Sequence, residues 1–133
     1  MPAALRPGVG NRIFGCDVCQ DVCPFYAMAA RSAAPEWQPR PDLEHPALID
    51  LWRRSDGDLA RLVAGTPLTR PKLTGLRRNV AVAIGNCGDP AGEMASADQD
   101  GRSAPGDASS RYDPMVREHV AWAAANHRTG GIP

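Results

Sequence analysis

Three of the four cysteines lie close together, in the order Cys16-x2-Cys19-x3-Cys23-Pro24. This spacing matches the last three cysteines of the bacterial ferredoxin run C-x2-C-x2-C-x3-C-P, in which thiolates hold the irons of iron–sulfur clusters. In two-cluster ferredoxins the cysteine before the proline ligates the neighbouring cluster. Because three thiolates cannot complete a four-thiolate cluster, the spacing predicts only part of an iron–sulfur electron-transfer site.

Zinc binding, a redox-active pair and a triplet without metal are the alternatives for these cysteines. Zinc sites usually combine two C-x2-C pairs, or one such pair with spaced histidines, and His45, His119 and His127 do not show the H-x3-5-H spacing. A thioredoxin-like pair needs C-x-x-C at a helix start after a strand, whereas Cys16 and Cys19 lie beside a third cysteine. Iron–sulfur ligation is the interpretation that the spacing favours.

The fourth cysteine, Cys87, lies far from the triplet at the end of an apolar run. A lone cysteine there is most often a small buried residue, so we expect packing at a helix end rather than metal ligation. The chain has no signal-like apolar stretch near its first residue and no run of eighteen apolar residues. We therefore expect a monomeric cytoplasmic protein with no membrane partner, in which disulfides are disfavoured.

The composition favours closely packed helices. Of the 133 residues, 43% are hydrophobic and only 5% aromatic, so a core must be built mainly from Ala, Leu and Val. The expected fold class is mainly α, with a partial ferredoxin-like 4Fe-4S cluster segment followed by a HEAT-like helical repeat module. The formal net charge is zero, so the chain as a whole does not attract a polyanion. It is also too short for a catalytic domain with its accessories.

The punctuation of the chain predicts four parts. Residues 1–31 form the partial 4Fe-4S ferredoxin-type segment. The linker at 32–46 contains four prolines, which fix φ and remove backbone donors too often for a helix. Residues 47–127 form the helical module, with a flexible insertion at 91–111 built mostly from Ala, Ser, Gly and Asp. Residues 128–133 form a tail.

Two short helices are predicted at the start of the helical module. The first follows Pro46, where a proline suits the first helical turn. The second begins at Ser55, which with Asp58 three residues later resembles a capping box. Gly65 follows its apolar residues and predicts where this helix stops.

Two longer helices are predicted in the second half of the module. One covers residues 76–86, where four residues form an apolar stripe: Leu76, Val80, Ala83 and Ile84. The other begins with Asp113 as N-cap and Pro114 as its first residue, and extends to Asn126 and His127. Short helices that are separated by Asp-Pro pairs suggest HEAT-like repeats, which stack to bury a shared face.

A local basic patch precedes and enters the predicted helix at residues 76–86. Residues 70–78 contain no acid, and their four basic residues are Arg70, Lys72, Arg77 and Arg78. We expect Arg77 and Arg78 to face away from the apolar stripe. The patch could contact RNA phosphates, or it could simply be the solvated face of a helix, and the sequence leaves both open.

Three stretches together resemble one protein family. The stretch GNRIFGCDVCQDVCPF resembles the second cluster motif of the epoxyqueuosine reductases. LRRNVAVAIGNCGDP and DPMVREHVAWA similarly resemble two helices of the C-terminal, HEAT-like part of that family. The resemblance covers most of residues 10–90 and 112–125.

This resemblance implies an oxidoreductase that reduces epoxyqueuosine to queuosine in the tRNA anticodon, using cobalamin and two 4Fe-4S clusters. It implies that Cys16 and Cys19 ligate the second cluster and Cys23 the first. The cobalamin-binding catalytic part does not match these residues, so no catalytic residue is named and the fragment alone is expected to be inactive. The implied partners are the tRNA anticodon stem-loop and, for a split enzyme, a separate chain that carries the catalytic half. The alternative is a non-catalytic HEAT-like module that binds RNA or protein, with a vestigial or zinc-binding cysteine triplet.

Overall fold

The computed structural model describes residues 1–30, 32–87 and 112–128, and every regular element in these residues is helical. None of the described helices is long and apolar enough to cross a bilayer. The short elements before the module are η1 (Ala3–Leu5), η2 (Pro7–Val9), α1 (Val18–Asp21), α2 (Pro24–Met28) and η3 (Pro35–Trp37). The module itself contains α3 (Leu48–Arg53), α4 (Asp56–Val63), η4 (Pro67–Thr69), α5 (Lys72–Cys87) and α7 (Pro114–Arg128).

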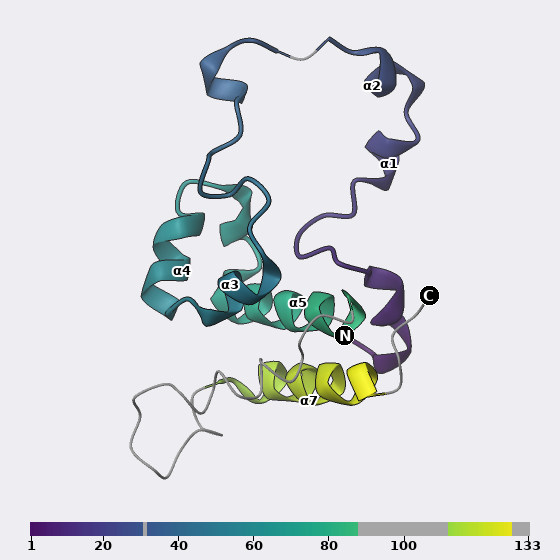
Figure 1. Cartoon of the computed structure of the whole chain (residues 1–133), viewed down its shortest axis with the longest axis vertical. Helices are drawn as coiled ribbons and strands as arrows, with labels where there is room; N and C mark the ends of the chain where they lie inside the picture. The colour runs from purple at the N-terminus through teal and green to yellow at the C-terminus, as the bar shows by residue number, and fades with distance from the viewer. Residues whose placement is uncertain (31, 88–111, 129–133) are drawn as a thin grey trace.

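Helix α5 is the centre of the module, with α7 along one side and α3 and α4 on another (Figure 1). The stripe predicted for α5 is buried, and Ala81 and Val82 are buried as well, so α5 is covered nearly all round. At Gly85 the two long helices approach so closely that a Cβ there would lie 2.7 Å from the Cα of Ala123. The small residues predicted from composition therefore permit a tight helix–helix contact.

The two long helices run in the same direction. Arg78, in the first half of α5, contacts Met115 near the start of α7. Near the C-terminal ends of both helices, the Nδ2 of Asn126 donates to the carbonyl oxygen of Gly85 across 2.9 Å. The mainly α fold class is therefore confirmed for the described residues. The HEAT-like repeat and the ferredoxin-like cluster segment remain predictions.

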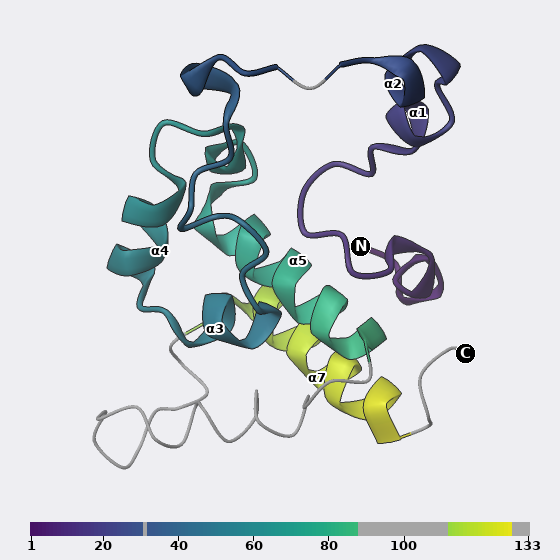
Figure 2. The same cartoon turned by 45° about the horizontal axis from the view of Figure 1, so that its top comes forward.

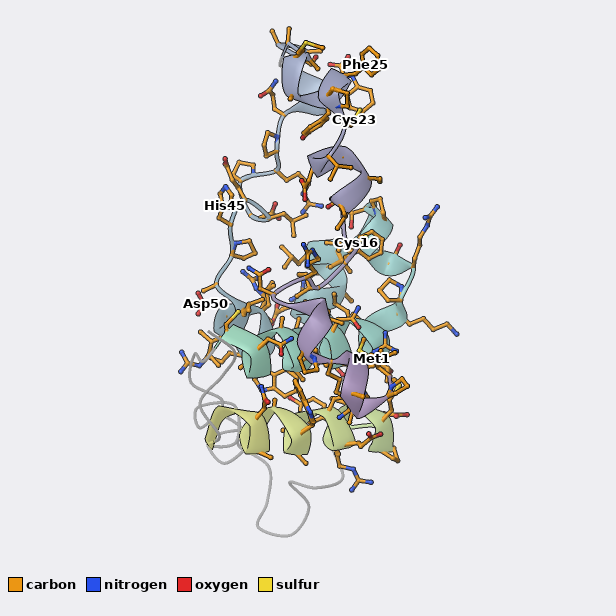
Figure 3. The ribbon with its side chains drawn as sticks, turned by 90° about the vertical axis from the view of Figure 1, so that its right-hand side faces the viewer. Met1, Cys16, Cys23, Phe25, His45 and Asp50 are labelled. Atoms are coloured by element: carbon orange, nitrogen blue, oxygen red, sulfur yellow. The ribbon has the colours of Figure 1, made fainter. Side chains whose placement is uncertain are left out.

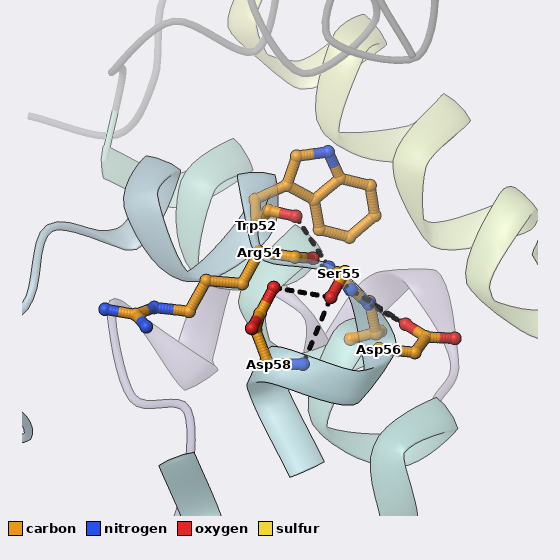
Figure 4. A network of polar contacts seen from close by, with 6 residues as sticks. Trp52, Arg54, Ser55, Asp56 and Asp58 are labelled. Atoms are coloured by element: carbon orange, nitrogen blue, oxygen red, sulfur yellow. Dashed lines mark hydrogen bonds and ion pairs between the residues drawn. The ribbon is translucent and has the colours of Figure 1, made fainter. Parts of the chain in front are cut away.

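The predicted helix starts at Ser55 and Asp113 are confirmed by their caps. Asp58 N donates to Ser55 Oγ across 3.1 Å, and the hydroxyl donates in turn to the Asp58 carboxylate (Figure 4). Met115 N donates to Asp113 Oδ1 across 2.8 Å. Both side chains satisfy a backbone donor that the first helical turn leaves without a carbonyl partner.

The predicted start of α5 is too late in the chain. Gly75 and the preceding prolines look like a connection, which places the start at residue 76, but α5 begins at Lys72. Gly75 is buried inside the helix, and a Cβ there would lie 3.1 Å from the Cβ of Pro71. Its small size thus allows the preceding turn to pack against the helix.

The cysteine segment, which we define as residues 14–30, extends away from the helical module (Figures 1 and 2). It contains α1 and α2, and the chain returns to α3 through a stretch without α-helix that includes the short helix η3. The described residues of the proline-rich linker predicted at 32–46 therefore contain no α-helix. The insertion predicted at 91–111 and nearly all of the tail predicted at 128–133 lie outside the described residues.

Candidate metal centre

The chain that leads into the cysteine segment is tied to the module by two asparagines of α5. Asn79 Nδ2 donates to the carbonyl oxygen of Ile13, 2.8 Å away. Asn86 Nδ2 donates to the carbonyl oxygens of Arg6 and Gly10, each 2.9 Å away. These contacts join residues far apart in the sequence, so no local pattern could have revealed them.

Arg6 fixes the same end of the chain to α7. Its guanidinium is buried, donates to the carbonyl oxygen of Met1 and forms an ion pair with Glu118. It also lies 5.6 Å from the centre of the Trp122 ring, a cation–π arrangement. The hydrogen bond from Arg6 lowers the pKa of Glu118, which favours its charged form. The base of the cysteine segment is thus held by charge, ring contact and hydrogen bonds.

The backbone turns sharply around the cysteines. Gly15 and Asp17 both have positive φ, at 64° and 49°, immediately before α1, which carries Cys19. Cys23 is the N-cap residue of α2, and Pro24 is the first residue of that helix. The proline after the third cysteine therefore begins a new helix, a position that its fixed φ favours.

The three thiols do not converge. Cys16 and Cys19 are exposed and Cys23 is half-buried, and the described residues include no group of three or more metal-binding side chains. Figure 3 shows Cys16 nearer the module and Cys23 further out, close to Phe25. Soft thiolates suit iron–sulfur clusters, so the donor chemistry fits the predicted group. Three thiols are too few to supply all the ligands of either predicted cluster. Each cluster would need further ligands from elsewhere.

Large apolar side chains are exposed on the same segment. The exposed fraction is 73% for Val22, 79% for Phe25 and 74% for Met28. Such a concentration of exposed apolar residues is typical of a surface that contacts another polypeptide. The thiols and the apolar residues lie on the same short stretch of chain.

The placement predicted for Arg77 is wrong. The side chain does not face solvent but is buried, and it donates to the carbonyl oxygens of Trp52 and Arg54 and to the carboxylate of Asp56. The guanidinium also lies 5.5 Å from the Trp52 ring centre and 5.6 Å from that of Tyr112. The physical reason is that a long amphipathic side chain can enter a core when carbonyl acceptors lie within its reach.

The predicted basic patch is therefore divided. Arg70 and Lys72 are exposed at the start of α5. Arg78 is half-buried, and its Nε and Nη2 donate to Asn79 Oδ1 across 3.0 and 2.8 Å. Arg78 lines a pocket with Arg12, a residue that no sequence pattern singled out. The prediction that Cys87 is buried is also wrong, because this residue is exposed at the last position of α5.

Comparison with known proteins identifies a set of similar sequences, although no family model and no solved structure matches the chain. An epoxyqueuosine reductase of Shewanella oneidensis is 36% identical over 99% of this chain, which corresponds to 32% of that protein. The epoxyqueuosine reductase of Alicycliphilus denitrificans is 39% identical over 94% of the chain and 34% of its own length. That of Escherichia coli is 34% identical over 94% of the chain and 31% of its own length. The predicted resemblance is thus confirmed: over nearly its whole length the chain is homologous to epoxyqueuosine reductases, and it spans about a third of theirs.

Proposed function

We propose that this chain is the cluster-bearing C-terminal part of a tRNA epoxyqueuosine reductase. Its observed basis is the spacing Cys16-x2-Cys19-x3-Cys23-Pro24 on a segment that extends from the module. Cys16 and Cys19 would hold one 4Fe-4S cluster and Cys23 another. When bound, the clusters supply one-electron transfer for the reduction of epoxyqueuosine to queuosine in the anticodon.

The remaining ligands and the cobalamin site would come from polypeptide outside these 133 residues, on the same or another chain. Support comes from the ligand count, because three thiols serve two clusters incompletely. The exposed Val22, Phe25 and Met28 would then be covered by that polypeptide. On this basis the 133 residues alone have no reductase activity.

The role of this chain's own residues is to position the thiols. Asn79 and Asn86 fix the backbone that leads into the cysteine segment, and Arg12 Nε donates to the carbonyl oxygen of Cys16 across 3.1 Å. Arg70 and Lys72 remain candidates for phosphate contacts to the tRNA. Arg77 does not belong to that set, because its nitrogens donate to groups within the protein.

A chimera tests this proposal. This chain would replace the matching segment of the Escherichia coli relative, in a strain without its own epoxyqueuosine reductase, and tRNA nucleosides would be measured by mass spectrometry. Queuosine is expected from the chimera, and it should be lost on Cys16→Ser or Cys19→Ser. Cys87→Ser, the same chemical change outside the triplet, should retain it. Accumulation of epoxyqueuosine in the unmodified chimera, despite normal amounts of folded protein, would contradict the proposal.

The second candidate is a non-catalytic module that binds RNA or protein, with a vestigial or zinc-binding triplet. The observation behind it is that the described residues bring no three metal-binding side chains together, so they form no complete metal site by themselves. It predicts a chimera whose triplet holds no iron, with either stoichiometric zinc or no metal at these cysteines. Iron and acid-labile sulfide with the visible absorption of iron–sulfur clusters would exclude it.

A further inference from the structure

A pocket of about 390 Å³ lies between the base of the cysteine segment and α5. Its walls include Arg12, Ile13 and Phe14 from the chain leading to the cysteines, and Arg78 and Asn79 from α5. Its volume falls near the lower end of the range for small-ligand pockets, about 300–1,000 Å³. The pocket can therefore hold a group the size of one nucleotide, but not a helix.

The pocket is electropositive and has no carboxylate among its lining residues. Arg12 donates from its Nε to the carbonyl oxygen of Cys16, and within the described part of the chain its two terminal nitrogens make no hydrogen bond. Both of these nitrogens can therefore donate to a ligand. Asp17 lies against Gly15 but does not line the pocket. Two guanidiniums without a lining acid favour an anionic ligand, and planar guanidiniums suit phosphate in particular.

The arginine on α5 is held in place before any ligand arrives. Arg78 donates twice to the Oδ1 of Asn79, and the Nδ2 of Asn79 donates to the carbonyl oxygen of Ile13. This chain of hydrogen bonds orients the guanidinium and joins the two walls of the pocket. Binding would therefore cost less side-chain entropy than binding by a free surface arginine.

Phe14 adds an apolar ring to the lining and remains partly exposed. An aromatic ring beside guanidiniums is the combination that proteins use for unpaired nucleotides, with the base on the ring and the phosphate on the arginines. Cys16 also lines the pocket, but Cys19 and Cys23 do not. Because Cys16 is a predicted ligand of the second cluster, the pocket adjoins the predicted place of that cluster, while the other two predicted ligands lie outside its lining.

We propose that this pocket binds one unpaired nucleotide of the RNA substrate, with Arg12 and Arg78 on its phosphate and Phe14 against its base. The choice of RNA rests on the proposed function, whereas the phosphate and base chemistry rests on the pocket. The pocket replaces the predicted helix-face patch as the principal RNA contact of the described chain. It also places the bound nucleotide beside the cysteine segment.

The experiment measures binding of a fluorescent RNA hairpin with an unpaired loop to the full chain, by anisotropy at several salt concentrations. Phe14→Leu should weaken binding about five- to a hundredfold, the range expected when one base–aromatic stack is removed. Arg12→Gln with Arg78→Gln should weaken binding and reduce the slope of log K against log salt by about 0.7 for each phosphate that the variant no longer neutralises. A fully paired duplex of the same stem should bind more weakly than the hairpin.

Arg40→Gln with Arg61→Gln is the charge-matched control, because it removes two exposed arginines that pair with Asp42 and Asp58 outside the pocket. Circular dichroism would establish that each variant is folded, and the exposed Phe14 provides a test even if the Arg78 variant does not fold. Equal RNA affinity of the pocket and control variants would overturn the proposal. If the pocket bound a nucleoside 5′-monophosphate but the chain did not bind the hairpin, the claim that the bound nucleotide belongs to RNA would be overturned.

The same variants in the chimera separate this proposal from the proposed function. Weaker RNA binding by the pocket variants, in a chimera that assembles no clusters, would refute the electron-transfer role alone. A chimera that forms queuosine while its pocket variants bind RNA like the parent would refute the pocket alone. Pocket variants that fail to bind a protein partner, with RNA affinity unchanged, would assign the pocket to a polypeptide and overturn the proposal.

Discussion

Replacement of Arg77 by methionine tests the internal role assigned to this arginine. Methionine keeps much of the apolar stem but removes every donor, so the carbonyl oxygens of Trp52 and Arg54 lose the hydrogen bonds that now satisfy them. An unsatisfied buried acceptor costs about 1–3 kcal/mol. The ion pair with Asp56 adds little because that carboxylate is 62% exposed and screened by water. We expect the free energy of unfolding to fall by about 2–5 kcal/mol in total.

Arg78→Met is the matched control, since it is the same change one residue along α5. Arg78 donates mainly to its neighbour Asn79, so we expect a loss of less than about 1 kcal/mol. For domains of about 60–250 residues 1 kcal/mol corresponds to about 2–8 °C in Tm, so thermal unfolding followed by circular dichroism separates the two variants. If Arg77→Met unfolded at the temperature of the parent, the assignment of Arg77 to the core would be refuted.

Three further predictions concern the contact of α5 with α7. Gly85→Ala should lower the Tm, because overlap with Ala123 costs about 1–3 kcal/mol and exceeds the helix-propensity gain of about 1 kcal/mol. A Cβ added at Gly57 would lie 3.8 Å from the nearest neighbouring side chain, so Gly57→Ala should leave the Tm unchanged or raise it. Equal effects of the two changes would contradict the close contact at Gly85. Trp122→Ala should lower the free energy of unfolding by about 3 kcal/mol, which is the lower end for a core aromatic because the Trp122 ring is only half-buried. An unchanged Tm would disprove its packing role. Burial lowers the pKa of His119, so the unfolded chain binds the proton more tightly and stability should fall as the pH drops below about 6.5. That part of the pH dependence should disappear in His119→Asn, and its persistence would exclude His119 as the cause.

Local signals in the sequence were sufficient for the helix starts that depend on one side chain. Ser55 and Asp113 cap the helices as predicted, because a cap is a contact between residues two or three apart. The start of α5 was missed because the role of Gly75 depends on its contact with the preceding turn. A glycine that permits close packing and a glycine that ends a helix look the same in a single sequence.

The cysteine spacing could be recognised from the sequence, whereas the surroundings of the cysteines could not. Asn79 and Asn86 hold a stretch of chain more than sixty residues away, and Arg12 meets Arg78 only in the folded protein. The same limitation explains Arg77, whose acceptors lie on α3 and at the start of α4. Contacts between distant segments carry no periodicity along the chain, so pattern analysis cannot find them.

The proposed cluster ligation is decided by the iron and sulfide content of the purified chimera, measured without oxygen together with its visible absorption. We predict two 4Fe-4S clusters in the parent chimera and a marked loss of iron when Cys16, Cys19 and Cys23 are all changed to serine. Cys87→Ser should retain the iron of the parent. Equal iron and sulfide in the triple variant and the parent would show that these three thiolates do not hold the clusters.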